Sequence, residues 1–196
     1  MSSNDINAFR LRLPRDERKH SWLPLLLDCY ALIDFSVAQA IEQAEKSEKK
    51  LACHKGCAAC CSQVIPLSTL ECLGIKFYVQ NILDPQHQAA LHEKLNGPLA
   101  TCLFNFAGCC AVYPLRPIAC RRYLVCSRPC AKGEVPAVTR PADSLEPSRE
   151  YLQQAIELTL PFYKEQNIPF KDNERGFEFY KRQNVQLSSA YANIIM

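Results

Sequence analysis

Apolar residues recur at steps of three and four between residues 21 and 50, which places them on one face of a helix. Ser21 can cap the start of this helix, and Pro24 is tolerated only in a first turn. The apolar positions are Leu23, Leu26, Leu27, Tyr30, Ile33, Val37, Ala40, Ile41 and Ala44. The pattern predicts one long helix whose apolar face belongs to a core.

Local start signals predict two shorter helices in the middle of the chain. Ser68 is followed three residues later by Glu71, which is the spacing of a capping box and predicts a helix over residues 69–82. Asp84 and Pro85 then provide an N-cap and a first-turn proline for another short helix.

Helical spacing returns in the C-terminal quarter of the chain. It covers residues 148–166, where Pro161 is expected to kink or end the helix. A last helix is predicted over residues 174–196, with an interruption near residues 186–189. The fold class is therefore mostly α, a small helical domain built around an irregular cysteine-rich core.

Residues 99–141 lack this periodicity and contain five prolines. A segment of this length without regular structure needs another source of order, which metal cross-links would supply. Residues 1–20 are polar and mixed in charge, which is typical of a terminal arm. We expect a polar arm over residues 1–20 and a single helical domain over residues 21–196, with its metal-binding cysteine core at residues 52–131.

Composition and charge narrow the class of protein. The 196 residues suit one domain, and a net charge of +3 is too small to indicate a nucleic-acid partner. The first residues have no signal-peptide pattern. The most apolar run, Leu23 to Phe35, is broken by Asp28 and Asp34 and reads as too short to span a bilayer. We expect a cytoplasmic protein with no membrane partner.

Twelve cysteines are the most unusual feature of the composition, and ten of them fall in two stretches, residues 53–61 and 102–130. In a reducing compartment, closely spaced cysteines more often bind metal or do redox chemistry than form disulfides. The adjacent pairs Cys60–Cys61 and Cys109–Cys110 would also be strained disulfides. Metal or an iron–sulfur cluster is therefore favoured over a disulfide framework.

The first cysteine stretch, residues 53–61, reads C-H-K-G-C-A-A-C-C. A two-residue gap lets two sulfurs face one metal at about 2.3 Å. Adjacent side chains diverge, so Cys60 and Cys61 are expected to serve different metals or different corners of a cluster. The predicted metal ligands are Cys53, Cys57, Cys60, Cys61, Cys102, Cys110, Cys120 and Cys126. They could make two four-cysteine sites, or one polynuclear site plus a structural zinc.

The remaining candidates have weaker signals. Cys29 and Cys72 lie on predicted helices and read as packing residues. Cys109 and Cys130 could ligate or act as a free nucleophile, and His54 competes with Cys53 for the first ligand position.

Basic residues follow the later cysteines closely, namely Arg116, Arg121, Arg122, Arg128, Lys132 and Arg140, against the single acid Glu134. Four thiolates on one Zn²⁺ carry a net charge of −2, which nearby cations would offset. Arg116 and Arg121 are expected to point inward, since guanidinium donors can bond several sulfurs and carbonyls. A solvated loop or a nucleic-acid patch is the alternative interpretation.

Two motifs carry a resemblance to a known family. The stretch at residues 53–61 is followed by I-P-L-S-T-L-E, and residues 110–121 read C-A-V-Y-P-L-R-P-I-A-C-R. Together they resemble the CxxCxxCC cysteine-cluster family, described as a zinc- or iron-chelating domain. The resemblance covers residues 53–126. It departs from the family pattern in the three-residue first gap, and Cys109 and Cys130 have no firm family counterpart.

The resemblance implies metal chelation and little more, because the family has no generally assigned reaction. We expect a protein that binds zinc or iron through cysteine thiolates. The alternative is an iron–sulfur-dependent enzyme or redox accessory protein, since similar clusters are found in flagellin lysine methylases. Against an enzyme, the chain has no glycine-rich phosphate loop, paired carboxylates or Ser–His–Asp pattern. No catalytic residue is predicted.

Overall fold

The computed structural model describes residues 3–131, 133–169 and 176–196. The predicted mostly α fold class is confirmed. The helices are α1 (Ser3–Asn7), α2 (Pro14–Glu17), α3 (Trp22–Lys46), α4 (Thr69–Asn81), α5 (Pro85–Leu95), α6 (Ile118–Arg122), α7 (Pro136–Thr139), α8 (Arg149–Glu165), α9 (Gly176–Gln183) and α10 (Leu187–Ile195). The strands are β1 (Pro66–Leu67), β2 (Asn105–Phe106), β3 (Cys109–Cys110) and β4 (Val185–Gln186), and the 3₁₀ turns are η1 (Ala59–Ser62), η2 (Tyr113–Leu115) and η3 (Pro141–Asp143).

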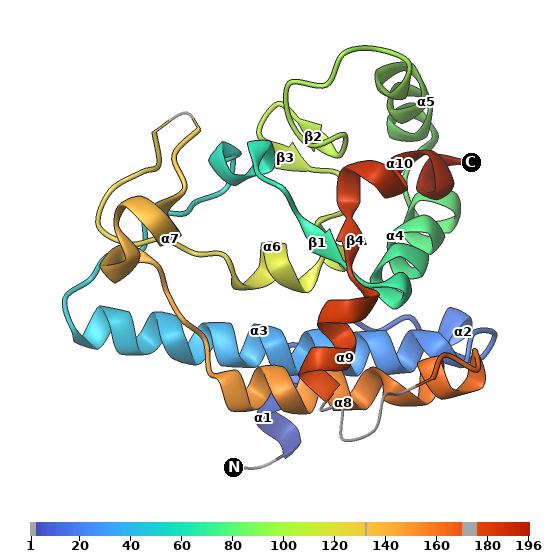
Figure 1. Cartoon of the computed structure of the whole chain (residues 1–196), viewed down its shortest axis with the longest axis horizontal. Coiled ribbons are helices and arrows are strands. Elements are labelled where there is room, and N and C mark those ends of the chain that lie inside the picture. The colour runs from blue at the N-terminus through green and yellow to red at the C-terminus, as the bar shows by residue number, and fades with distance from the viewer. Residues whose placement is uncertain (1–2, 132, 170–175) are drawn as a thin grey trace.

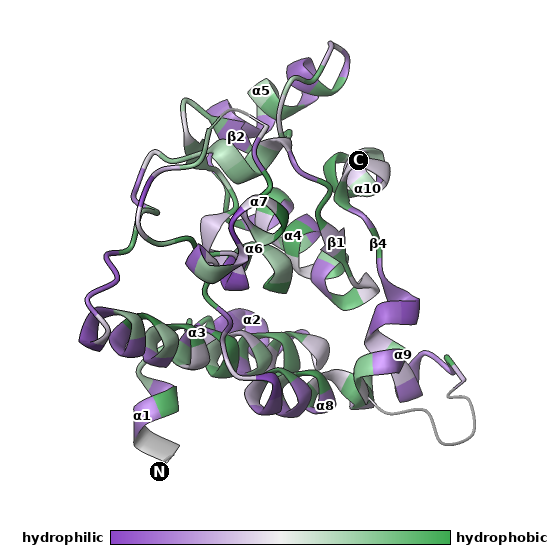
Figure 2. Ribbon diagram, turned by 60° about the vertical axis from the view of Figure 1, so that its left-hand side comes forward, coloured by the Kyte–Doolittle hydropathy of each residue, from purple (hydrophilic) through white to green (hydrophobic). Residues whose placement is uncertain are grey.

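Helices α3 and α8 lie side by side and run in opposite directions along one side of the molecule (Figure 1). Their apolar faces form the first of two hydrophobic clusters, to which α9 and part of α4 also contribute. Apolar colour runs along α3, with polar residues gathered toward its C-terminal end (Figure 2). The predicted inner positions Leu23, Leu26 and Ile33 are each at most 1% exposed. The apolar positions predicted from the sequence therefore face the core between α3 and α8.

The apolar composition of α3 has two possible causes. By length and hydropathy alone the helix could cross a membrane, so the expectation that this segment is too short to span a bilayer is corrected. In the fold, however, 61% of its most apolar window is buried against the rest of the chain. Packing inside the protein is sufficient to explain why this helix is so apolar.

The other side of the molecule holds the second hydrophobic cluster. It is formed by α4, α5, α10 and the segment that contains the hairpin β2–β3 (Figure 1). The predicted interruption of the last helix is a short strand, β4, which pairs antiparallel with β1. In this pair Pro66 faces Gln186 and Leu67 faces Val185. The first residues of the predicted last helix, 174–175, lie outside the described residues.

Two of the three N-caps predicted from the sequence are present in the structure. The capping box is confirmed: the amide of Ser68 donates to Glu71 Oε2 at 2.7 Å, and the amide of Glu71 donates to the Ser68 hydroxyl. Asp84 accepts from the amide of His87 at 3.0 Å, which confirms the predicted cap of α5. Ser21 differs, since its own backbone is already helical and its side chain caps nothing.

Pro161 neither ends α8 nor marks its last turn, because the helix continues to Glu165. The expectation of a stop at this proline is wrong, while that of a kink stays a prediction. The residues around it are held by packing: Phe162 and Tyr163 are 5% and 1% exposed, and both belong to the first hydrophobic cluster. Burial of two aromatic side chains outweighs the hydrogen bond that a proline removes from a helix.

Glu71 links three helices of the fold through its side chain. Its side chain is buried, and besides the amide of Ser68 it accepts hydrogen bonds from the amide of Ile118 at 2.7 Å and the hydroxyl of Tyr180 at 3.0 Å. Burial raises the pKa of this carboxyl. Glu71 thereby fixes the starts of α4 and α6 relative to α9.

The N-terminal arm packs on α3. Arg10 forms ion pairs with Glu17 at 2.7 Å and with Asp28. Phe9 makes an edge-on contact with Phe35, with 5.9 Å between the ring centroids. These contacts place the arm beside the middle of α3, where it helps to form a cleft described below.

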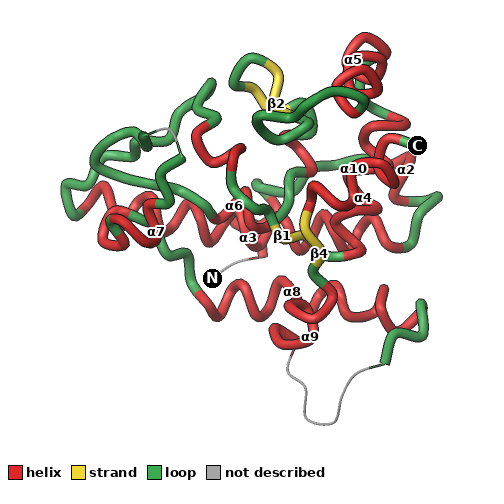
Figure 3. The backbone as a smooth tube through the Cα atoms, turned by 45° about the horizontal axis from the view of Figure 1, so that its top comes forward, coloured by secondary structure: helices red, strands yellow, loops and turns green. Residues whose placement is uncertain are grey.

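Residues 99–141 are the most irregular part of the chain, as predicted. Loops predominate on this side of the molecule (Figure 3). The prediction omitted the short elements within the segment, which are the hairpin β2–β3, the turn η2 and the helices α6 and α7. Each is at most five residues long, so no periodic pattern could announce it.

Candidate metal centre

The two predicted cysteine-rich segments are joined through their backbones. The amide of Cys102 donates a hydrogen bond to the carbonyl of Cys61, with an N–O distance of 2.7 Å. Gly108, in the turn of the hairpin β2–β3, lies against the backbone of Gly56. The segments therefore meet at two points, and each point lies within a few residues of several cysteines.

The first segment folds as two consecutive turns. Gly56 has a φ of 88°, and the amide of Cys57 donates to the carbonyl of His54 at 3.0 Å. The amide of Cys61 donates to the carbonyl of Ala58 at 2.9 Å within the next turn. Left-handed backbone of this kind favours a residue without a Cβ atom, which explains the glycine in this turn.

A third segment, near residue 125, holds Cys53 in place. The amide of Ala52 donates to the carbonyl of Val125 at 2.8 Å, and Leu51 pairs with Cys126 in an isolated bridge. The amide of Val125 points at the sulfur of Cys53, with an N–S distance of 3.4 Å. An amide directed at sulfur is a contact that stabilises a thiolate or a metal-bound sulfur.

Cys60 lies at the centre of the thiols. Its side chain accepts a hydrogen bond from Cys61, which is the main cause that lowers the pKa of Cys60 and raises that of Cys61. The expectation that these adjacent side chains diverge is therefore wrong. Cys60 also interacts electrostatically with thiols from three other parts of the chain, which are Cys53, Cys110, Cys120 and Cys130.

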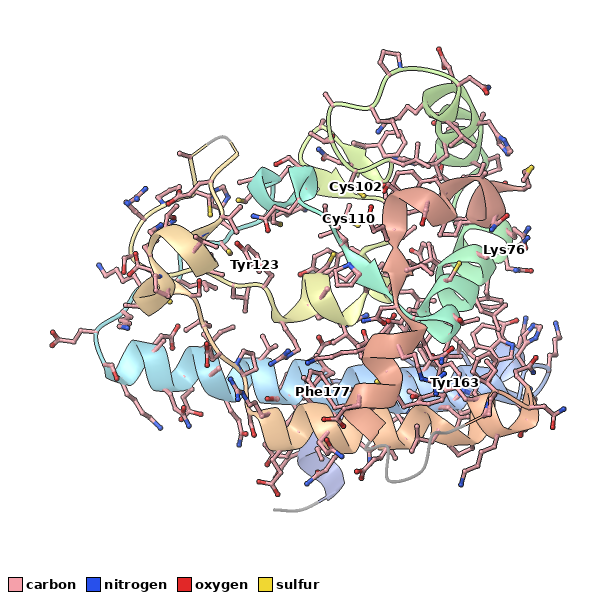
Figure 4. The ribbon with its side chains drawn as sticks, in the orientation of Figure 1. Lys76, Cys102, Cys110, Tyr123, Tyr163 and Phe177 are labelled. Atoms are coloured by element: carbon pink, nitrogen blue, oxygen red, sulfur yellow. The ribbon has the colours of Figure 1, made fainter. Side chains whose placement is uncertain are left out.

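A second set of contacts gathers around Cys102. It interacts with Cys61, Cys110 and Cys120, and its side chain is hydrogen-bonded to the hydroxyl of Tyr191. Cys102 and Cys110 lie close together in Figure 4. Seven of the eight predicted ligands therefore belong to one connected group of thiols, which we call the thiol core: Cys53, Cys57, Cys60, Cys61, Cys102, Cys110 and Cys120.

Apart from Cys60, whose pKa is lowered, the thiols of the core that have a shifted pKa favour neutral sulfur in the absence of a cation. Burial is the main cause that raises the pKa of Cys110 to about 11, and it raises the pKa of Cys120 further. A bound cation reverses this balance, because a coordinating thiol is deprotonated outright. The donor set fits a thiophilic metal ion such as zinc or iron.

The thiols are near one another without forming a coordination shell. Within residues 3–131, 133–169 and 176–196, no three side chains of ligand type are arranged to hold a metal ion. All twelve cysteines lie in this part of the chain, and all are free thiols. Four sulfurs at about 2.3 Å from one zinc would be closer together than this arrangement has them. A metal would have to draw the loops inward.

Cys126, the eighth predicted ligand, lies apart from the thiol core. It is 0% exposed, its amide donates to the carbonyl of Asp143 at 2.8 Å, and its electrostatic neighbours are Lys49 and Asp143. Cys130 lies closer, since it interacts with Cys57, Cys60 and Cys53. Of these two cysteines, the structure brings Cys130 rather than Cys126 near the thiol core, and whether either binds metal stays a prediction.

The other candidates are placed as follows. Cys29 is fully buried in the first hydrophobic cluster, which raises the pKa of its thiol. Cys72 lies on α4 at the edge of the second cluster. Cys109 is exposed on β3, and His54 is exposed with its ring nitrogen bonded to the carbonyl of Lys55.

Two arginines lie beside the core in different ways. The guanidinium of Arg116 stacks on the ring of Tyr113 at 3.8 Å and acts electrostatically on Cys60, Cys110 and Cys120. This placement agrees with the predicted neutralising role.

Arg121 points inward, as predicted, but it binds oxygen rather than sulfur. It donates to the carbonyl of Arg116 at 3.0 Å and to the carbonyl of Pro114, and it pairs with Asp34. Its guanidinium also lies 3.9 Å from the ring centre of Tyr30. Arg121 therefore fixes the η2–α6 turn to α3.

The remaining basic residues are mostly paired with carboxylates. Arg128 and Arg140 both bond to Glu134, and Arg140 also bonds to Asp143 at 3.0 Å. Arg140 additionally donates to the sulfur of Cys130 at 3.7 Å. Arg122 donates to a backbone carbonyl, that of Pro147. Lys132 lies outside the described residues.

No family model matches this chain, and neither a curated protein nor a solved structure matches it. The resemblance to the CxxCxxCC family therefore stays a prediction from the two motifs.

Proposed function

We propose that this protein binds zinc or iron through the thiol core. The central position of Cys60 carries the proposal. Cys60 interacts with Cys53 and Cys61 of its own stretch and with Cys110, Cys120 and Cys130, which are far from it along the chain. Buried free thiols have no need to converge on one point for packing alone, whereas a metal ion requires it.

Cys130 replaces Cys126 in the proposed ligand set. Cys126 is enclosed by backbone pairing with Leu51 and by Asp143, so it would have to leave a bridge to reach a metal. Cys130 already interacts with Cys53, Cys57 and Cys60. The set then divides into four thiols around Cys53 and four around Cys102, with Cys60 touching both groups.

The proposal implies a compartment that keeps thiols reduced, such as the cytoplasm, since an oxidising compartment would turn these neighbouring thiols into disulfides. The partner is a metal ion. Whether the metal serves structure or an iron–sulfur-dependent reaction depends on its identity.

Metal content tests the proposal. The protein is purified anaerobically, and zinc, iron and acid-labile sulfide are measured per chain together with the visible spectrum. We expect stoichiometric metal in the wild type, and lower metal content in Cys57→Ser and Cys120→Ser. Cys29→Ser is the matched control, because Cys29 is buried outside the thiol core. Its metal content should not change.

The spectrum separates the two functional classes. Colourless protein with zinc supports a structural or metal-handling role, whereas a brown protein with sulfide supports an iron–sulfur role. A folded wild-type protein that is purified anaerobically and carries neither metal would overturn the proposal.

A further inference from the structure

An open cleft of about 480 Å³ lies on the face of α3 that the N-terminal arm partly covers. The arm, α3 and the turn η2 form its walls. Its polar lining residues are Arg10, Tyr30, Asp34, Tyr113, Arg116 and Arg121, and the other lining residues are apolar. This volume is within the range of small-molecule sites, which are mostly apolar with a few convergent polar groups.

The charges of the cleft are not all neutralised. Arg10 is paired with Glu17 and Asp28, and Arg121 is paired with Asp34. Among the described residues, Arg116 has no carboxylate partner. One positive charge at the wall of the cleft is therefore available to a ligand.

Two buried donors in the lining also have no acceptor. The Nε atom of Arg116 is buried and makes no hydrogen bond within the described residues, and the same is true of the hydroxyl of Tyr30. Tyr30 is 3% exposed, so water does not replace the missing partner easily. Both atoms are shielded from the cleft, so a ligand would meet the outer nitrogens of the Arg116 guanidinium instead.

We propose that this cleft binds a small amphipathic carboxylate, an aliphatic or aromatic acid. The guanidinium of Arg116 holds the carboxylate, and the apolar body lies against α3. Charge-assisted hydrogen bonds from a guanidinium are among the strongest in proteins, and the stacking on Tyr113 fixes the plane of this guanidinium in advance.

The cleft shares one residue with the candidate metal centre, because Arg116 also interacts with Cys60, Cys110 and Cys120. None of these thiols accepts a hydrogen bond from it in the described residues, so its outer guanidinium nitrogens stay free for the ligand. The proposal does not depend on metal binding, since the walls and the donors are present without a metal.

Calorimetric titration of the full-length protein with decanoate tests the proposal, with decan-1-ol and decylamine as matched neutral and cationic probes. We expect saturable binding of decanoate, affinity at least about tenfold lower for decan-1-ol, and no saturable binding of decylamine, because the alcohol loses the charged contact. Arg116→Gln should lower decanoate affinity by about tenfold or more and leave decan-1-ol affinity unchanged.

Two further variants make the test specific. Arg12→Gln removes the same charge from an exposed residue that does not line the cleft, and it should leave decanoate affinity unchanged. Ala38→Phe fills the cleft from α3 and should weaken decanoate and decan-1-ol alike. Far-UV circular dichroism and thermal melting confirm that each variant is folded.

Several outcomes would overturn the proposal: no saturable binding of decanoate to the wild type, equal affinity for decanoate and decan-1-ol, or equal effects of the Arg116→Gln and Arg12→Gln substitutions. Metal content is measured on the same samples. Metal-loaded protein that does not bind decanoate contradicts only the proposed carboxylate site. Metal-free protein that binds decanoate contradicts only the proposed metal centre.

Discussion

A Cβ atom added to Gly108 would lie 2.5 Å from the carbonyl oxygen of Gly56. Both glycines also have positive φ values, 85° and 88°. The turn of the hairpin β2–β3 and the turn between Cys53 and Cys57 therefore touch through bare backbone. This contact and the hydrogen bond from Cys102 to Cys61 bring the cysteines of two distant segments together.

Gly108→Ala should weaken the protein more than Gly56→Ala. Both alanines would hold a left-handed backbone, which costs about 1–2 kcal/mol. Only the alanine at position 108 meets another backbone, since a Cβ at Gly56 has open space around it. We expect Gly108→Ala to cost about 2 kcal/mol more in urea unfolding. Equal costs would show that the two turns do not touch.

Tyr191→Phe should destabilise the hairpin side of the molecule. The hydroxyl of Tyr191 accepts a hydrogen bond from the buried amide of Leu103 at 3.1 Å. Without it, this amide has no acceptor, which costs about 1–3 kcal/mol. Denaturant unfolding measures the loss. Tyr113→Phe is the matched control at a 59% exposed ring and should stay within about 0.5 kcal/mol of the wild type.

Features set by neighbouring residues could be predicted from the sequence. The capping box of Ser68 and Glu71 and the cap at Asp84 need only a few adjacent residues, and both are present. The face of α3 is set by a repeat that runs through the helix. The strand β4 could not be predicted in this way, because its two residues are extended only through pairing with β1.

The candidate site likewise combines features that local sequence indicates with features that depend on residues far apart in the chain. The structure places seven of the cysteines that the motifs name near one another, although their role as metal ligands stays a prediction. The motifs did not distinguish Cys126 from Cys130, because the loop after Cys126 reverses at Ser127, whose φ is 70°. The acceptor role of Glu71 toward Ile118 and Tyr180 was also hidden, since it joins three elements far apart in sequence.

Glu71→Gln should change how stability depends on pH. Burial raises the folded-state pKa of Glu71 above its ordinary value of 4.5, so the folded protein takes up this proton more readily than the unfolded chain. The resulting stabilisation is complete below about pH 4.5 and is lost as pH rises through the raised pKa. Relative to Glu71→Gln, the wild type should therefore lose stability between acidic and neutral pH.

Urea unfolding of both proteins across this pH range measures the effect. Glu157→Gln, at an exposed position on α8, provides the control and should run parallel to the wild type. A constant difference between the wild type and Glu71→Gln at every pH would contradict the raised pKa.

Cys130→Ser should lower the metal content, whereas Cys126→Ser should lower the stability of the fold. Cys130 interacts with three members of the thiol core and is held by Arg140, so its loss should lower the metal content per chain. Cys126 is fully buried and pairs through its backbone, so a serine there buries a hydroxyl and lowers unfolding stability by about 1–3 kcal/mol. Metal per folded chain should then match the wild type. Metal analysis and denaturant unfolding of both variants separate these outcomes, and loss of metal only in Cys126→Ser would restore the ligand set expected from the motif.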